Sequence, residues 1–203
     1  WLDHARGVPN VALRSALFSV SRQPVRPFLE QQVIQSQNGY EIIYTGPRLD
    51  QGDLDIWETV LHIAREQTLG GEVRVTACHM LKLLGQTDTG KNRASLQRHL
   101  SRLNATALHI QAGRYSYEGS LIDEVQRDTH TRQYIIRLNV GLQSLFASHQ
   151  YTRVEWDIRQ SLRGKPLAQW LHGYYASHAK PFPVTVETIH RLCGSETAAL
   201  WKF

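Results

Sequence analysis

Residues 87–108 read TDTGKNRASLQRHLSRLNATAL, and they predict a helix that carries many basic and amide side chains. Leu96, Leu100 and Leu103 recur at positions i, i+4 and i+7, so they form an apolar stripe that packs inward. No acidic residue occurs between Lys91 and Ala107. A face of this composition supplies the donors and amides that phosphates and base edges accept. The stretch therefore predicts a DNA-contacting helix, and the alternative is a basic surface helix without a partner.

The candidate contacts of this helix are the polar and cationic side chains that a helical wheel places away from the leucine stripe. On the outward face we expect Lys91, Ser95, Arg98 and Arg102, and on one shoulder Arg93, Gln97 and Ser101. Cations at these positions suit phosphates, and the amide and hydroxyl groups suit base edges as well.

An internal repeat places this helix in a helix-turn-helix unit. The two copies are VTACHMLKLLG (75–85) and VTVETIHRLCG (184–194), which share the pattern V-T-x-x-x-(M/I)-x-(K/R)-L-x-G. The threonine of each copy suits the N-cap of a helix, and the final glycine suits the left-handed residue that ends one. A chance match is the alternative, but a duplicated helix-turn-helix unit explains the shared pattern better.

Strand signals follow the first unit. They are ALHIQAG (107–113), YSYEGSLIDEV (115–125) and RQYIIRLNV (132–140), with the polar loop QRDTHT (126–131) before the last. A helix-turn-helix followed by a β-hairpin is the winged-helix arrangement. The polar loop is then the predicted wing tip, and we expect Arg127 and Arg132 to contact the DNA backbone or minor groove. The alternative is a hairpin tip that only faces solvent.

The predicted fold is α+β, with two tandem winged-helix domains. Residues 1–148 form the first, which also holds an N-terminal helix (11–18, capped by Asn10) and a hairpin turning at Asn38–Gly39. Residues 149–203 form the second, which we expect to be C-terminally incomplete because no second wing follows its repeat. Its position after the second copy adds three candidate DNA-binding residues, which are Ser195, Thr197 and Lys202.

The composition is that of a folded protein with a mild basic excess. The 203 residues are 41% hydrophobic, the formal net charge is +5 and the pI is about 9.4, which permits nucleic-acid binding. No apolar run approaches the roughly 20 residues of a membrane span, and the opening WLDHARG is too polar for a signal peptide. Cys78 and Cys193 favour two buried free thiols in a reducing cytosol. We therefore expect a cytoplasmic protein with no membrane partner.

Enzymatic and metal sites are not predicted. The segment GQTDTGKN (85–92) is close to the nucleotide-binding pattern G-x-x-x-x-G-K-(S/T), but Asn92 lacks the hydroxyl that holds Mg²⁺, and a helix precedes it where that motif needs a strand. The ten histidines and two cysteines do not have zinc-ligand spacing. We expect no catalytic residue, metal or cofactor, and ATP turnover would be needed to revive an enzymatic interpretation.

Three segments resemble the TrfA-type replication initiators of broad-host-range plasmids. They are VPNVALRSALF (8–18), LSRLNATAL (100–108) and YYASHAKPFPVTVETIHRLCGS (174–195). The resemblance implies two winged-helix domains, binding to direct repeats (iterons) at a plasmid origin and opening of adjacent AT-rich DNA. It also implies recruitment of host replication proteins, namely the host initiator, helicase and sliding clamp, and a switch to an inactive homodimer. The family's clamp-binding motif precedes the segment present in this chain.

The alternative function is a transcriptional repressor with the same fold, because fold alone does not separate two DNA-binding roles. An initiator should also bind one strand of the opened AT-rich DNA, whereas a repressor has no need to. Single-stranded DNA binding is therefore the observation that distinguishes them.

Overall fold

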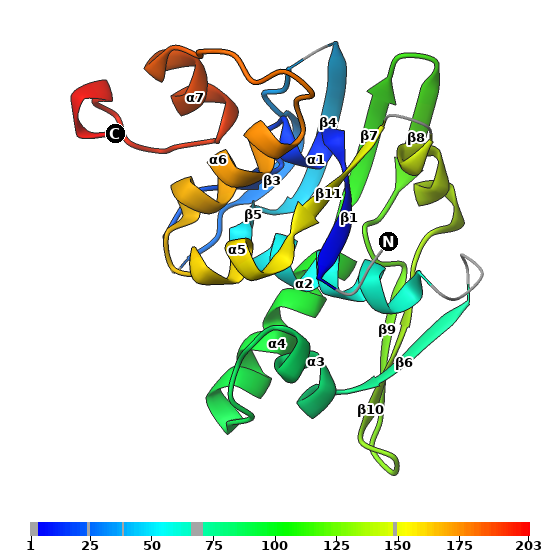
Figure 1. Ribbon diagram of the computed structural model, residues 1–203. Coiled ribbons are helices and arrows are strands. Elements are labelled where there is room, and N and C mark those ends of the chain that lie inside the picture. Colours follow the sequence, from blue (N-terminus) through cyan, green and yellow to red (C-terminus); the bar gives the residue numbers. More distant parts are fainter. Residues whose placement is uncertain (1–3, 24, 38, 66–70, 148–149) are drawn as a thin grey trace.

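The computed structural model describes residues 4–23, 25–37, 39–65, 71–147 and 150–203, which form a mixed α+β fold (Figure 1). The first half contains β1 (Ala5–Pro9), α1 (Asn10–Leu13), β2 (Phe18–Ser19), β3 (Phe28–Val33), β4 (Tyr40–Pro47), β5 (Leu49–Asp50), α2 (Gln51–Ala64), β6 (Glu72–Thr76), α3 (Ala77–Leu83) and α4 (Gly90–Asn104). The second half contains β7 (Ala107–Ala112), β8 (Tyr115–Gly119), β9 (Glu124–Asp128), β10 (Gln133–Arg137), the 3₁₀ helix η1 (Val140–Phe146), β11 (Tyr151–Glu155), α5 (Trp156–Ser161), α6 (Pro166–Ala176), α7 (Val186–Leu192) and the 3₁₀ helix η2 (Leu200–Lys202).

The first repeat copy lies in a winged helix built from α2, α3, α4 and a three-stranded sheet. The strand order is β6-β10-β9, with both pairs antiparallel, so the strand before α3 pairs with the last strand of the wing. Leu96, Leu100 and Leu103 of α4 are all buried in the main core, as the sequence predicts. Their stripe fixes which face of α4 is turned away from the protein.

The hairpin of β7 and β8 does not belong to the wing. It joins β3 and β4 in a four-stranded antiparallel sheet of order β3-β4-β7-β8, in which Ile42 pairs with Ile110. The expected continuous strand over 115–125 is wrong, since β8 ends at Gly119 and β9 begins at Glu124. Alternation predicts a strand here, but it does not say which sheet the strand enters.

The N-terminal helix is much shorter than the sequence predicts. It covers only Asn10–Leu13, and its N-cap is Pro9 rather than Asn10. The backbone N–H of Leu17 donates to the hydroxyl of Ser15, a local bond that competes with helix continuation. The predicted hairpin is present as β3 and β4, with Gly39 at φ +70, while Asn38 lies outside the described residues.

The beginning of the chain pairs with the strand that follows the expected domain boundary. Strand β1 is antiparallel to β11, in register from Ala5 with Glu155 to Pro9 with Tyr151. The main core therefore extends from Val8 to Trp156, and a second, smaller cluster contains Trp170, Tyr174, Leu192 and Cys193. The expected boundary at residues 148–149 falls outside the described residues and stays a prediction.

A buried polar network connects α2 with the segment after β11. Arg159 of α5 is 1% exposed, and its Nε lies 2.7 Å from a carboxylate oxygen of Asp55 and 3.1 Å from one of Glu58. Glu58 is fully buried, and this burial raises its pKa to about 7, although Arg159 opposes the shift. The amide of Gln169 on α6 also donates to Asp55, at 3.2 Å. These bonds fix α5 and α6 against the first winged helix.

Both repeat copies have the local structure that the shared pattern predicts. The hydroxyl of Thr76 accepts from the N–H of His79 at the start of α3, and that of Thr185 accepts from the N–H of Thr188 at the start of α7. Gly85 and Gly194 end these helices at φ +61 and +64. After each glycine the same pair of backbone bonds closes the helix end. The repeat is therefore a repeat of structure, and its second copy continues into η2.

Candidate nucleic-acid interface

Helix α4 presents most of the predicted contact residues to solvent. Its N-cap is Thr89, whose hydroxyl accepts from the N–H of Asn92 at 3.2 Å. The exposed candidates are Lys91, Arg93, Gln97, Arg98 and Ser101. Ser95 is half-buried and lines an open cavity beside α2.

Arg102 does not share this exposed face, and its expected placement is wrong. Its side chain is only 18% exposed and lies 2.9 Å from the carboxylate of Asp53, which is 0% exposed. His99 contacts the same carboxylate at 2.7 Å. Burial alone would raise the pKa of Asp53, but the hydrogen bonds and charges of His99 and Arg102 hold it below its usual value. Arg102 therefore joins α4 to α2.

The carboxylates near His99 have structural roles. Asp50 and Asp53 form a capping box, in which each side chain accepts the other's backbone N–H at the start of α2. Together with His99 they bring three ligand-type atoms within 4.8 Å of one another. Arg26 pairs with Asp50 and Arg102 pairs with Asp53, so each carboxylate already has a cationic partner within the protein. Sequence reasoning missed this cluster because Asp50 and Asp53 lie 46 or more residues before His99 in the chain.

Arg93 is exposed but engaged. Its guanidinium donates two bonds to Asp88, at 2.5 and 2.6 Å, across the turn before α4. From here on the term outward face means Lys91 and Arg98, opposite the leucine stripe, together with Gln97 and Ser101 on its shoulder, and all four are exposed. This face combines two cations with an amide and a hydroxyl, which is a set suited to phosphates and base edges.

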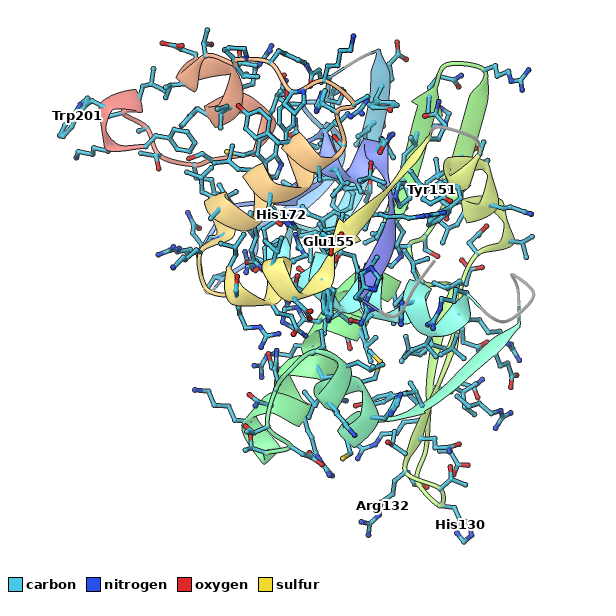
Figure 2. The ribbon with its side chains drawn as sticks, viewed as in Figure 1. His130, Arg132, Tyr151, Glu155, His172 and Trp201 are labelled. Carbon is cyan, nitrogen blue, oxygen red and sulfur yellow. The ribbon has the colours of Figure 1, made fainter. Side chains whose placement is uncertain are left out.

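The wing places a second group of cations at the same end of the molecule. Arg132 lies in the turn between β9 and β10 at φ +56, and Figure 2 shows it at the tip with His130. The tip is ordered by Asp128, whose carboxylate accepts from the N–H groups of His130 and Thr131 at 2.8 and 3.1 Å. Arg127 is exposed, but it lies within β9 rather than in the loop as predicted.

The candidates from the second copy lie at the other end of the molecule, near α7 and the C-terminus (Figure 1). The hydroxyl of Ser195 accepts from the N–H of Thr197 at 3.3 Å, and the carbonyl of Thr197 accepts from His190 at 2.8 Å. Lys202 lies over the ring of Trp201, 4.9 Å from its centroid. The structure therefore brings α4 and the wing together, but it does not bring these three residues to them.

Two smaller sequence expectations are also decided by the geometry. The nucleotide-binding pattern follows helix α3 rather than a strand, and the amide of Asn92 donates to the carbonyl of Thr87, so the turn is filled by its own side chain. Cys193 is buried, which raises the pKa of its thiol to about 11. Cys78 is exposed, so the expectation that both thiols are buried is wrong.

Comparison with known proteins gives one family. Residues 1–203 match the family model described as TrfA protein. The plasmid replication initiator protein TrfA of Escherichia coli is 29% identical over 211 residues, a match that covers 100% of this chain and 55% of that protein. The chain thus spans about half the length of this relative. Within the described residues, no helix has the length and apolar character to cross a membrane.

Two crystal structures of domains 2 and 3 of RctB have a similar fold. One has a TM-score of 0.59 and 14% sequence identity, and it covers 89% of this chain and 75% of that one. The other has a TM-score of 0.57 and 13% identity, with 92% and 76% covered. At this level of identity the likeness concerns the fold alone.

Proposed function

The chain belongs to the TrfA family of plasmid replication initiators, and from this premise we propose that it binds duplex DNA at direct repeats of a plasmid origin. Proteins of this family are DNA-binding proteins and not enzymes. The observation that carries the proposal is the outward face of α4, which lies at the same end of the molecule as the wing. In a helix-turn-helix protein the second helix of the unit enters the major groove.

The residues divide into two kinds of contact. Lys91 and Arg98 on α4, with Arg127 and Arg132 on the wing, supply positive charge for phosphates. Gln97 and Ser101 complete the outward face and supply groups that can read base edges, together with Ser95 at its margin. Arg93 stays a proposed contact, and to bind a phosphate it would have to give up one or both of its hydrogen bonds to Asp88. We propose that Arg102 lies behind the interface and supports α4.

The role of the second copy is also part of the proposal. We infer that residues 149–203 belong to a second winged-helix domain, whose candidate contacts are Ser195, Thr197 and Lys202. Two linked reading units would raise the affinity for adjacent DNA segments, because the second contact becomes intramolecular. The family then suggests the later steps, which are opening of AT-rich DNA in the bacterial cytoplasm, recruitment of the host initiator, helicase and sliding clamp, and an inactive homodimer.

A salt titration of duplex binding tests the proposed interface. We expect the Lys91→Ala, Arg98→Ala double variant to lower the slope of log affinity against log salt by about 1.8, at about 0.9 for each lost phosphate contact. Arg153→Ala is a matched control, because Arg153 is exposed on β11 and away from the outward face. An unchanged slope in the double variant would show that α4 does not dock on DNA.

Single-stranded DNA separates the initiator from the repressor of the same fold. An initiator should bind one strand of the AT-rich origin segment as well as the duplex repeats, and a repressor should bind the duplex alone. The measurement is a titration with each separated strand, using a scrambled strand of the same composition as the control. Binding to duplex operator-like DNA without any binding to either strand would favour the repressor.

A further inference from the structure

A second basic surface lies beside the helix-turn-helix turn, outside the interface described above. The chain has four long stretches without any Asp or Glu, at residues 4–29, 89–117, 129–154 and 158–186, and three of them contribute to this surface, namely 4–29, 89–117 and 158–186. The first stretch leads to Arg22, the second contains α4, and the third contains the loop between α5 and α6. Arg22, Arg163 and Lys165 on these stretches have no Asp or Glu within five residues in sequence.

The fold brings the three stretches together through the loop between α5 and α6. Arg163 in this loop donates to the carbonyl of Gly85 at 3.2 Å, and its other terminal nitrogen donates to the carbonyl of Leu84. Two hydrogen bonds therefore join the loop to the turn between α3 and α4. Arg22 donates to the carbonyl of Gly164 at 3.2 Å. The loop is therefore held on one side by the helix-turn-helix turn and on the other by the N-terminal segment.

An open cavity of about 400 Å³ lies between this loop, α4 and the start of α2. We use the term basic rim for the exposed cations Arg22, Arg163 and Lys165, of which Arg22 and Arg163 line the cavity and Lys165 follows the lining residue Gly164. Two acidic residues line the cavity, and both are neutralised, since Asp50 pairs with Arg26 and Asp55 pairs with Arg159. The charge that the rim presents to solvent is positive.

The position of the basic rim indicates which part of a bound duplex it would contact when α4 lies in the major groove. The turn before a recognition helix lies close to the sugar–phosphate backbone, because the N-terminal part of that helix enters the groove while the preceding helix crosses the backbone. Arg163 is bonded to that turn. Lys165, two residues further along the loop, and Arg22 beside it extend positive charge from the turn toward the flank of a bound duplex.

We propose that the basic rim binds backbone phosphates of duplex DNA that flank the segment read by α4. The inference rests on the proposed function, since it assumes that α4 docks on the duplex. In this proposal the loop between α5 and α6, which follows β11, contacts the same duplex as the first helix-turn-helix unit. It also assigns a role to Arg22, which precedes the first winged helix in sequence.

The test uses the Arg22→Ala, Lys165→Ala double variant, and it leaves Arg163 intact because that side chain holds the loop. The matched control is Arg153→Ala, Lys180→Ala, which removes the same charge from exposed residues outside the rim. We expect the first double variant to lower the salt slope by about 1.8, at about 0.9 for each phosphate, with equal loss on repeat and scrambled duplexes. Hydroxyl-radical protection should shrink at one end of the footprint only.

The outcomes separate this inference from the proposed function. If the parental chain binds duplex and the Lys91→Ala, Arg98→Ala variant loses slope, but the rim variant matches its control in slope and footprint, the rim is not a DNA contact and the proposed interface stands. If the parental chain does not bind duplex, both fail. A rim variant whose melting temperature falls below that of its control is replaced by Arg22→Gln, Lys165→Gln, which keeps side-chain length without charge.

Discussion

Replacing Arg102 with alanine should destabilise the fold, whereas replacing Arg98 with alanine should weaken DNA binding and leave stability unchanged. The two residues lie one turn apart on α4, and the sequence places them on one face. In the structure Arg98 is exposed, while Arg102 lies 2.9 Å from the carboxylate of Asp53. The same substitution at two neighbouring positions therefore tests which residues of α4 contact DNA and which stabilise the fold.

The expected magnitude follows from the burial of Asp53, whose side chain is 0% exposed. Removing one partner of a buried ion pair costs about 3–5 kcal/mol when the other charge is left alone. His99 lies 2.7 Å from Asp53 and remains as its partner when Arg102 is replaced, so we expect a smaller loss of about 2 kcal/mol, within the range for a hydrogen bond to a charged group. For a chain of this size that loss lowers the melting temperature by about 4–8 °C.

The assay combines urea unfolding with the salt titration of duplex binding. Arg98→Ala should stay within about 0.5 kcal/mol of the parental unfolding free energy, as exposed substitutions usually do, and should lower the salt slope by about 0.9. A cycle with Asp53→Asn isolates the pair, because Arg102→Ala should cost much less once the carboxylate is neutral. Equal stability of both variants, with equal loss of slope, would refute the placement of Arg102 behind the interface.

Three further predictions concern the buried network, the repeat and the wing. The unfolding free energy should fall as the pH rises from about 4.5 to about 7, because burial raises the pKa of Glu58 from its usual 4.5 to about 7 and the folded state then holds a proton that the unfolded state releases; Glu58→Gln should flatten this slope in urea titrations. Gly85→Ala and Gly194→Ala should each lower the unfolding free energy by about 1–2 kcal/mol, because both glycines have a left-handed φ. Gly194→Ala should lower it more, because a methyl group there lies 3.0–3.1 Å from three neighbouring atoms, and thermal unfolding measures the difference. Arg127→Ala with Arg132→Ala should remove hydroxyl-radical protection of the duplex beside the wing, and an unchanged pattern would exclude the wing from the interface.

The sequence predicted local structure well where the signal is local. The threonine caps, the glycine helix ends and the leucine stripe of α4 all depend on residues within a few positions of one another, and all are confirmed. The partner of the hairpin over residues 107–119 depends on which distant strand is free to pair, and its alternating pattern is the same in either sheet. For this reason the sequence does not separate the hairpin over residues 107–119 from the strands of the wing.

The predicted position of Arg102 on the outward face is wrong for a related reason. A helical wheel gives the direction of a side chain around the helix axis, but not what packs beside it. The leucine stripe indicates one buried face of α4, and nothing in residues 90–104 indicates that α2 also covers the flank occupied by His99 and Arg102. The signal that could have found this contact is the pair Asp50 and Asp53 at the start of α2, since a buried capping carboxylate requires cations from elsewhere.

The two repeat copies share their helix ends but not their surroundings, and the surroundings decide what each turn can contact. The turn at Gly85 is exposed and leads into α4. The turn at Gly194 is buried, and Arg48, just before β5, donates to its carbonyl at 2.8 Å and pairs with Glu196 at 3.4 Å. An arginine from outside the unit therefore bonds each turn, since Arg163 donates to the carbonyl of Gly85, and the two turns differ in burial. We propose that the basic helix after the exposed turn at Gly85 supplies the main duplex contact, whereas the buried turn at Gly194 serves mainly as a packing contact and leaves Ser195, Thr197 and Lys202 as the proposed contacts of the second copy.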